Sequence, residues 1–232
     1  MQIKEAIVLA GGLGTRLRDA VPDLPKCMAP VNNKPFVSFV IDHLQKQGVE
    51  KFIFSLGYKS EAFTHFLSTY LPVENYRIII EDEPLGTGGA IQLACRHTTE
   101  KNVMVVNGDS IFKINLARQA SFHFTHKADC TLALKPMENF DRYGVVELNA
   151  DQTIALFKEK QFYPKGLING GVYLLNTEVF IQQGLPQKFS FETDYLQKFY
   201  STRKIYGVIQ DAYFIDIGIP EDYRKAQTEL IN

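Results

Sequence analysis

The chain lacks the features that mark several large classes of protein. Its 232 residues hold only three cysteines, Cys27, Cys95 and Cys130, and an odd, scattered set of this kind supports neither a disulfide framework nor a zinc site. A net charge of −1 gives no overall attraction to nucleic acid or to an anionic membrane, so any anion site must be local. No apolar run approaches membrane-spanning length, and the N-terminus leads into a strand without a signal peptide, so we expect a cytoplasmic protein.

The first half of the chain predicts alternating strands and helices. Pro35 suits a first helical position, and Gly48 suits the residue just past a helix end. Such alternation implies parallel strands, right-handed crossovers and helices on both faces of a sheet, with ligands bound beyond the carboxyl ends of the strands. We expect strands at 5–10, 51–57, 76–81 and 102–107, and helices at 35–47, 59–70 and 88–96.

The second half predicts more strands and longer connections. We therefore expect a Rossmann-like α/β fold with a mixed, mostly parallel sheet flanked by helices, and with inserted hairpins over the ligand side. No linker or internal repeat divides the chain, which predicts a single domain over residues 1–232. The expected strands lie at 129–135, 143–148, 153–158, 167–175, 203–209 and 213–217, and the helices at 115–126, 190–199 and 220–231.

A glycine-rich turn follows the first strand, in the run Ala6-Ile-Val-Leu-Ala-Gly-Gly-Leu-Gly-Thr-Arg-Leu-Arg18. Glycines allow backbone N–H groups to close around phosphate oxygens, and Arg16 and Lys26 supply cations nearby, so we expect a phosphate site. The turn is not a Walker loop, because no Gly-Lys-Ser or Gly-Lys-Thr is present. It is not a dinucleotide fingerprint either, because the glycines are too close together and position 17 is Leu.

Two carboxylates follow or interrupt apolar strands. Asp109 ends the run that begins at Val103, and Asp216 lies within Tyr213-Phe-Ile-Asp-Ile-Gly218, where an unpaired charge is costly. Asp109 taken alone is equally consistent with a turn or helix cap. Together the two suggest a shared Mg²⁺, which prefers hard oxygen ligands and substrate phosphates. The histidines lie on expected helices or their ends, and we expect them at the surface or in packing: His43, His65, His97, His123 and His126.

The motifs and their order resemble the sugar-1-phosphate nucleotidylyltransferases along nearly the whole chain. The similarity is specific because it rests on many segments in the family's order. It implies the nucleotide-diphospho-sugar transferase type of fold, with a nucleotide-binding part at about 1–112 and a sugar-binding part at about 113–232. The segments are Gly11-Gly-Leu-Gly-Thr-Arg-Leu17, Pro25-Lys26, Pro84-Leu-Gly-Thr-Gly-Gly-Ala90, Asn107-Gly-Asp109, Tyr143-Gly144, Glu159-Lys160, Asn169-Gly-Gly-Val-Tyr173 and Phe214-Ile-Asp-Ile-Gly-Ile-Pro-Glu-Asp-Tyr223.

The resemblance assigns roles to residues in each part. Arg16, Lys26 and Asp109 would be catalytic, and Asp109 and Asp216 would hold Mg²⁺. The nucleotide would contact Leu9, Gly11, Gly12, Gly14, Thr15, Arg16, Lys26, Glu83, Leu85, Gly86, Thr87 and Gly88. The sugar phosphate would contact Asn107, Gly108, Gly144, Glu159, Lys160, Asn169 and Gly170.

Several of these residues have a plainer interpretation from their local sequence. Lys160 could lie at a solvated strand end, Asn169 in a turn, and 83–90 in an ordinary loop before a helix. Tyr143 and Tyr173 fit a core or a pocket wall.

The implied reaction needs little covalent chemistry from the protein. A sugar 1-phosphate is already a nucleophile, so the protein must align it with a nucleoside triphosphate and neutralise charge. The segment Pro84-Leu-Gly-Thr-Gly-Gly89 resembles the guanylyltransferase branch, and with the short chain and Cys27 it favours GTP and D-glycero-α-D-manno-heptose 1-phosphate for surface glycan synthesis.

Other substrates and functions stay open. They are mannose 1-phosphate with GTP, another sugar phosphate with UTP or dTTP, and a non-catalytic regulatory subunit. A metal-dependent glycosyltransferase would need an Asp-x-Asp motif, and Ser110 and Ile111 follow Asp109. The chain is expected to act as a monomer or a homo-oligomer.

Overall fold

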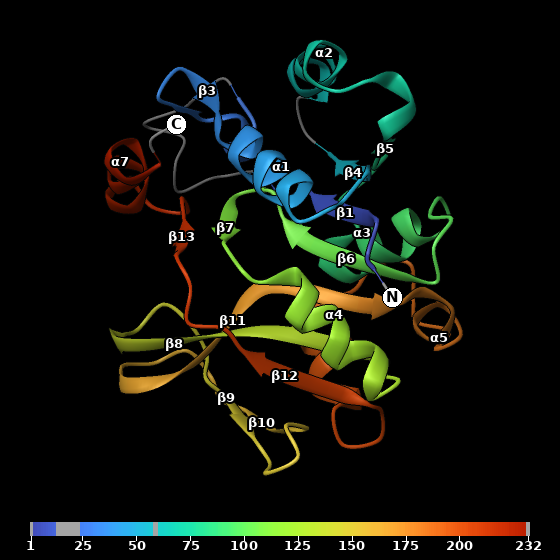
Figure 1. The fold of residues 1–232 in the computed structure, drawn as a ribbon, viewed down its shortest axis with the longest axis vertical. Helices are drawn as coiled ribbons and strands as arrows, with labels where there is room; N and C mark the ends of the chain where they lie inside the picture. Colours follow the sequence, from blue (N-terminus) through green and yellow to red (C-terminus); the bar gives the residue numbers. More distant parts are fainter. Residues whose placement is uncertain (1, 13–23, 58–59, 231–232) are drawn as a thin grey trace.

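The computed structural model describes residues 2–12, 24–57 and 60–230. Its centre is a seven-stranded sheet in the order β12-β8-β11-β6-β1-β4-β5 (Figure 1). These strands are β1 (Glu5–Leu9), β4 (Lys51–Leu56), β5 (Tyr76–Ile80), β6 (Asn102–Asn107), β8 (Cys130–Phe140), β11 (Tyr163–Asn176) and β12 (Ile205–Ile209).

The sheet is mixed, and parallel pairs predominate. β1 pairs in parallel with β4 and β6, β4 with β5, and β12 with β8, whereas β11 runs antiparallel to both β6 and β8. The inner strands β1, β4 and β6 read as continuous apolar runs because helices cover both faces of the sheet. The predicted fold class is confirmed.

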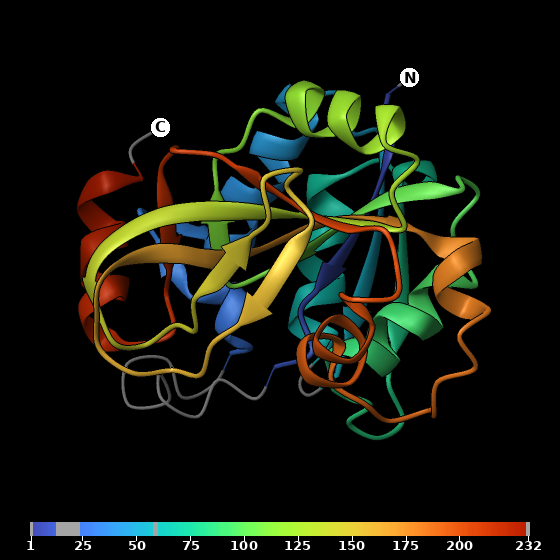
Figure 2. The same ribbon diagram turned by 90° about the horizontal axis from the view of Figure 1, so that it is seen from below.

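Helices cover the sheet on both sides. One core includes side chains of α1 (Phe36–Lys46), α2 (Ser60–Tyr70), α4 (Leu116–Thr125) and α7 (Pro220–Glu229). The other includes side chains of α3 (Gly86–Cys95), α5 (Thr177–Ile181), the π-helix η4 (Phe191–Leu196) and its continuation α6 (Gln197–Phe199). Figure 2 shows α4 on one side of the sheet and the 191–199 segment on the other.

Helix α1 illustrates how the sequence sets these boundaries. Phe36, Val40, Ile41 and Leu44 recur at helical spacing and are all buried on one stripe. The expected end signal is confirmed, because Gly48 has a φ of 92° just past the helix. Pro35 differs slightly from the expectation, since it lies one position earlier, at the N-cap.

Short strands outside the large sheet shape its ligand side. β7 (Ser110–Phe112) pairs with β13 (Phe214–Asp216), β9 (Val146–Leu148) with β10 (Ile154–Phe157), and β2 (Pro30–Val31) with β3 (Lys34–Pro35). The remaining 3-10 turns are η2 (Lys26–Met28) and η3 (Val73–Asn75). The predicted inserted hairpin is β9–β10, which lies at one end of the molecule in Figure 1.

The fold bears on two features of the sequence, its cysteines and the length of its apolar segments. All three cysteines are free and buried, which confirms their role in packing. None of the helices within the described ranges is long and apolar enough to cross a membrane.

Candidate active site

Two strand ends bring Asp109 and Asp216 together. Asp109 follows β6, and Asp216 ends β13, where it is paired with Ser110 of β7. The loop that carries Asp109 is tied to β13, because the backbone N–H of Ile217 donates to the Asp109 carbonyl at 3.1 Å. Pairing of β7 with β13 therefore places the two predicted metal ligands side by side, although they are far apart in the sequence.

Lys26 links these two carboxylates. Its Nζ donates to Asp109 Oδ2 at 2.6 Å and to Asp216 Oδ1 at 3.0 Å. The Lys26 side chain is 13% exposed. Lys26 is the first residue of η2, and the next two residues, Cys27 and Met28, are buried and hold the turn in place. Burial alone would lower the pKa of Lys26, but the charges of Asp109 and Asp216 outweigh it and raise that pKa. The structure therefore fixes a protonated ammonium between two carboxylates.

A cavity of about 450 Å³ opens beside this cluster. Asp109 and Asp216 line it, and so do most of the residues predicted to bind the sugar phosphate. Eight predicted site residues share this cavity: Asn107, Asp109, Gly144, Glu159, Lys160, Asn169, Gly170 and Asp216. Tyr143 and Tyr173 also line it, which confirms their assignment to a pocket wall.

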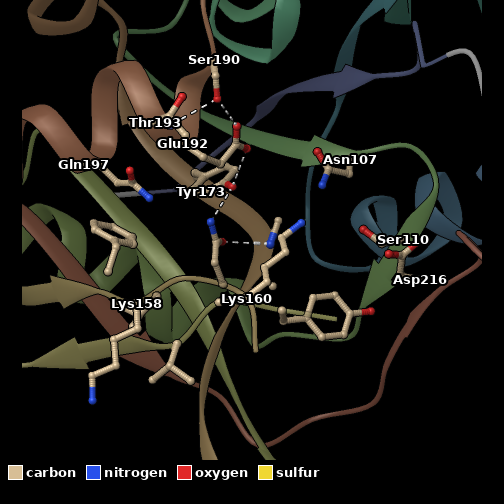
Figure 3. Close-up of a pocket in the computed structure, with 18 of the residues that line it drawn as sticks. Asn107, Ser110, Lys158, Lys160, Tyr173, Ser190, Glu192, Thr193, Gln197 and Asp216 are labelled. Atoms are coloured by element: carbon tan, nitrogen blue, oxygen red, sulfur yellow. Dashed lines mark hydrogen bonds between the residues drawn. The ribbon is translucent and has the colours of Figure 1, made fainter. Parts of the chain in front are cut away.

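Lys160 and Lys158 differ in direction although they are only two residues apart. Figure 3 shows Lys160 pointing into the cavity and Lys158 pointing away from it. Lys158 forms an ion pair with Glu147 on β9, whereas Lys160 has no acidic partner among the described residues. Lys160 is thus a cation available to a bound anion.

The wall formed by β11 is irregular where it meets the cavity. The register between β11 and β8 shifts between Asn169 and Tyr173, and Gly171 has a φ of 68°. This bulge turns Asn169 toward Tyr173 and brings Gly171 close to Asn107 at the end of β6. Position 170 requires glycine for a different reason, because a Cβ there would overlap the ring of Phe112.

Some predicted residues act in the framework of the site. A Cβ on Gly144 would overlap the Lys158 carbonyl, so glycine there permits close strand packing. The N–H of Gly108 donates to the Leu9 carbonyl at 2.8 Å. These contacts connect the loop before Asp109 to β1 and the cavity rim to the β9–β10 hairpin.

The structure describes part of the predicted phosphate loop. Gly11 and Gly12 follow β1, whereas Gly14, Thr15 and Arg16 lie outside the described residues. Gly11 packs near Glu81, whose carboxylate accepts hydrogen bonds from Ser55 Oγ and the Leu85 N–H, each at 3.0 Å. The sequence analysis missed Glu81, although its position just after β5 is a strand end of the kind that carries ligands in such sheets.

The segment 83–88 differs in detail from its expected form. Glycine was expected there to let a base approach the backbone, but Gly86 and Gly88 pack against the chain's own residue Phe189. The N–H of Gly88 donates to the Phe189 carbonyl at 3.0 Å, and the N–H of Phe189 donates to the Leu85 carbonyl at 3.0 Å. Glu83 and Leu85 line a second cavity that shares no lining residue with the first.

The cavity also contains residues that the sequence analysis did not select. Four of them, Ser190, Glu192, Thr193 and Gln197, lie at or in the helical segment 191–199. Figure 3 shows them on the side of the cavity opposite Asn107 and Asp216. Ser190 does carry a local signal, because it precedes a helix and its Oγ accepts from the Thr193 N–H, as an N-cap does.

These features place two carboxylates and two lysines at or beside one cavity of a Rossmann-like fold, and comparison with known proteins identifies the class of protein. The nucleotidyl transferase family matches residues 5–232, so the chain belongs to that family.

Several proteins are similar to this chain over nearly its whole length. The D-glycero-alpha-D-manno-heptose 1-phosphate guanylyltransferase of Aneurinibacillus thermoaerophilus is 53% identical over 97% of this chain and 98% of its own length. The protein of that name from Campylobacter jejuni subsp. jejuni serotype O:2 is 43% identical over 94% of this chain and 96% of its own length. The crystal structure of HddC from Yersinia pseudotuberculosis complexed with GMP-PN is 36% identical, has a TM-score of 0.88, and covers 99% of this chain and 100% of its own.

Proposed function

We propose that the protein transfers GMP from GTP to D-glycero-α-D-manno-heptose 1-phosphate, giving GDP-heptose and pyrophosphate. The single observation that carries this proposal is the cavity that joins the Lys26–Asp109–Asp216 cluster to Lys160 and Asn169. Charged side chains lie at one end of this cavity and polar side chains such as Asn169 along its wall, which supports binding of a sugar phosphate and a nucleotide. The names of the relatives support the choice of GTP and heptose.

In the proposed reaction, an oxygen of the sugar phosphate attacks the α-phosphorus of GTP. A new P–O bond forms as the bond to the pyrophosphate leaving group breaks, and the leaving electrons stay on pyrophosphate. No general base is needed, because the attacking phosphate is already an anion. The protein contributes by holding both phosphates in line and by stabilising the charge that develops between them.

The cations divide this work by position. Lys26 lies between the two carboxylates and is proposed to contact the reacting phosphates. Lys160 points into the cavity and is proposed to hold the phosphate of the sugar. Arg16 stays a prediction for the triphosphate tail, outside the described residues.

The carboxylate pair fits a magnesium ion. Asp109 and Asp216 offer hard oxygen ligands, and Mg²⁺ in such sites is bound by one or two carboxylates together with substrate phosphates. Among the described residues no group of three or more His, Cys, Asp and Glu side chains is placed to hold a metal ion. When bound, the ion would neutralise phosphate charge and help align the reacting groups.

Recognition of the base is proposed at the start of α3. The N–H groups of Leu85 and Gly88 already have partners in Glu81 and Phe189. The first helical turn also contains the N–H groups of Gly86 and Thr87, which have no acceptor within the helix because of their position. We therefore assign these two N–H groups, with the Glu81 carboxylate nearby, to the edge of guanine.

A pyrophosphate-release assay tests the proposed substrates. GTP, ATP, UTP and dTTP are each supplied with heptose 1-phosphate or mannose 1-phosphate, and initial rates are compared. We expect GTP with heptose 1-phosphate to give the highest kcat/KM, because a site built for particular hydrogen bonds rejects analogues that leave its groups unpaired. A pyrimidine preference would overturn the guanylyl assignment, whereas a mannose preference would change only the sugar.

A further inference from the structure

The Glu192 carboxylate accepts hydrogen bonds from three hydroxyl groups that lie in different parts of the site. Its Oε2 accepts from Thr87 Oγ1 at 2.7 Å and from Ser190 Oγ at 3.2 Å, and its Oε1 accepts from the Tyr173 hydroxyl at 3.3 Å. Thr87 lies in the first turn of α3, and Tyr173 lies on β11. One carboxylate therefore connects the loop assigned to the base with the wall assigned to the sugar.

The hydrogen bonds continue from Tyr173 to Asn169. The Asn169 side-chain NH₂ donates to the Tyr173 hydroxyl at 2.8 Å, and the Asn169 Oδ1 accepts from the Gly171 N–H at 3.1 Å. Figure 3 shows this series running from Ser190 through Glu192 and Tyr173 into the cavity. Asn169 lines the cavity and is a predicted ligand of the sugar.

A carboxylate imposes one direction on this series. An ionised carboxylate can only accept hydrogen bonds, so the Tyr173 hydroxyl must donate to Glu192. The hydroxyl oxygen then accepts from the Asn169 NH₂, and the amide oxygen is left for Gly171 and the cavity. Glu192 thus fixes the direction of the Tyr173 hydroxyl, and this hydroxyl together with the Gly171 N–H fixes which end of the Asn169 amide faces which neighbour.

Tyr173 is well suited to transmit this constraint. Its side chain is 1% exposed, and its ring packs against Phe191 with centroids 4.9 Å apart. Burial and the nearby charge of Glu192 raise the pKa of Tyr173, so its hydroxyl keeps its proton. The ring cannot turn away without disturbing the core. What Glu192 controls is therefore the direction in which the Tyr173 hydroxyl donates its hydrogen bond.

We propose that Glu192 is a positioning residue that sets the orientation of Asn169 toward the sugar. This inference rests on the proposed function, because it takes a sugar 1-phosphate as the ligand of the cavity. Glu192 lies in the π-helix η4, and π-helical segments are frequent at functional sites. The residue acts on sugar affinity through Tyr173, and its contact with Thr87 keeps the base loop seated against the same helix.

The variant Glu192→Gln tests this role. A glutamine has one acceptor oxygen, which can keep the two donors Thr87 and Ser190, while its NH₂ then faces Tyr173. The Tyr173 hydroxyl would then accept from it and turn its proton toward the Asn169 NH₂. A flipped Asn169 amide would instead set its NH₂ against the Gly171 N–H, so either arrangement loses a hydrogen bond. We expect the affinity for sugar 1-phosphate to fall about 10-fold, the loss of roughly one hydrogen bond, with GTP affinity changed less than about 2-fold.

A second variant and a control separate positioning from general damage. Tyr173→Phe removes the intermediate hydroxyl and should reproduce the loss, and the double variant should bind the sugar phosphate no more weakly than either single variant. Asp194→Asn is the matched control. It removes one negative charge from the same helix, and Asp194 contacts Ser190 N and Lys198 rather than Tyr173 or Thr87.

The two affinities are measured by titration calorimetry. Heptose 1-phosphate or GTP is titrated alone into each protein, so no turnover takes place. Sugar affinity that is unchanged in Glu192→Gln and Tyr173→Phe, or equal losses for both ligands, would overturn the positioning role. Failure of the unmodified protein to bind either heptose or mannose 1-phosphate would instead overturn the proposed function. Thermal unfolding of each variant shows whether a lost affinity reflects a lost fold.

Discussion

At the residue scale, the site depends on one ammonium group that two carboxylates share. Lys26 balances one of the two negative charges of Asp109 and Asp216, which are about one-third and one-quarter exposed, and the three side chains form a compact polar unit at the end of the sheet. In the proposed reaction, each carboxylate would exchange this lysine contact for a metal ion, and Lys26 would turn to the phosphates of the substrates. The chemistry of the site therefore depends on charges that are held ready at fixed positions.

Neutralising either carboxylate should stop the reaction while leaving the fold intact. Asp109→Asn and Asp216→Asn keep the side-chain shape but remove a metal-ligand charge, and we expect kcat to fall about 100-fold or more. Turnover measured across a Mg²⁺ titration is the test. Asp211→Asn, which neutralises an exposed carboxylate paired with Lys135, should behave as the unmodified protein. Variants with unchanged rates and unchanged Mg²⁺ dependence would exclude both residues from the metal site.

Lys160 and Lys158 form a natural comparison. Both carry the same charge on the same segment, but only Lys160 points into the cavity. Lys160→Ala should raise the KM for sugar 1-phosphate about 10-fold, because it removes a charge-assisted contact to phosphate. Lys158→Ala should leave that KM within about 2-fold, since an exposed ion pair such as that with Glu147 contributes little. Equal effects of the two substitutions would assign Lys160 to the solvated strand end.

At the scale of elements, the start of α3 is shaped by its contact with the segment before η4. Gly88 faces Phe189, and a Cβ there would overlap a ring that is itself buried and packed near Phe180. Overpacking of a core costs about 1–3 kcal/mol, which exceeds the gain of about 1 kcal/mol that alanine brings to a helix. The balance of these two effects favours glycine.

Gly88→Ala should therefore lower the free energy of unfolding, as measured by urea denaturation. The control is Gly12→Ala, because no atom of the described residues lies within 4 Å of a Cβ at Gly12. We expect the control to unfold with unchanged free energy, whatever its effect on turnover. A stabilised Gly88→Ala protein would mean that Phe189 moves aside and that the glycine serves another purpose.

The sequence predicted the elements whose signals are local. Strands β1, β4, β5, β6 and β12 and helices α1–α4 were found within one or two residues, because apolar runs and helical spacing record their burial. β8 was expected to end at 135 but continues to Phe140. β11 was predicted to be shorter, at 167–175, because its first residues, 163–166, include Pro164 and Gly166, are not buried, and are held by pairing with β8. Helix α5 and strand β7 were missed because they are too short for any periodicity.

The same distinction applies to the site. Asp109 and Asp216 were accessible to sequence reasoning because charges beside buried strands stand out, and Lys26 because of the family pattern. Glu192 was missed because its position depends on how segment 187–191 packs across the glycines of α3, a contact between distant parts of the chain.

At the scale of the whole molecule, a buried histidine connects the two halves of the sheet. His123 of α4 is 1% exposed, and its ring nitrogens hydrogen-bond Thr131 of β8 at 2.8 Å and Asn102 of β6 at 3.0 Å. A neutral imidazole satisfies this pair, with one nitrogen donating to the Asn102 oxygen and the other accepting from the Thr131 hydroxyl. Burial lowers the pKa of His123 to about 4.

This buried imidazole predicts a loss of stability in mild acid. The unfolded chain takes up the proton near its ordinary pKa of about 6.5, whereas the folded chain resists it until about pH 4. Stability is therefore fully present above about pH 6.5 and is lost as pH falls toward 4, by about 3 kcal/mol in all, of which about 2 kcal/mol is gone at pH 5. The lowered pKa of His43 acts in the same direction.

His123→Gln isolates the contribution of His123. Free energies of unfolding in urea are measured at pH 7.5 and pH 5 for the unmodified protein, for His123→Gln, and for His65→Gln as an exposed control. The buried variant should be less stable at pH 7.5, but its loss on acidification should be smaller by about 2 kcal/mol, because the titrating group is gone. The control should lose as much as the unmodified protein. An equal acid loss in all three proteins would show that other groups, such as His43, dominate the response to pH.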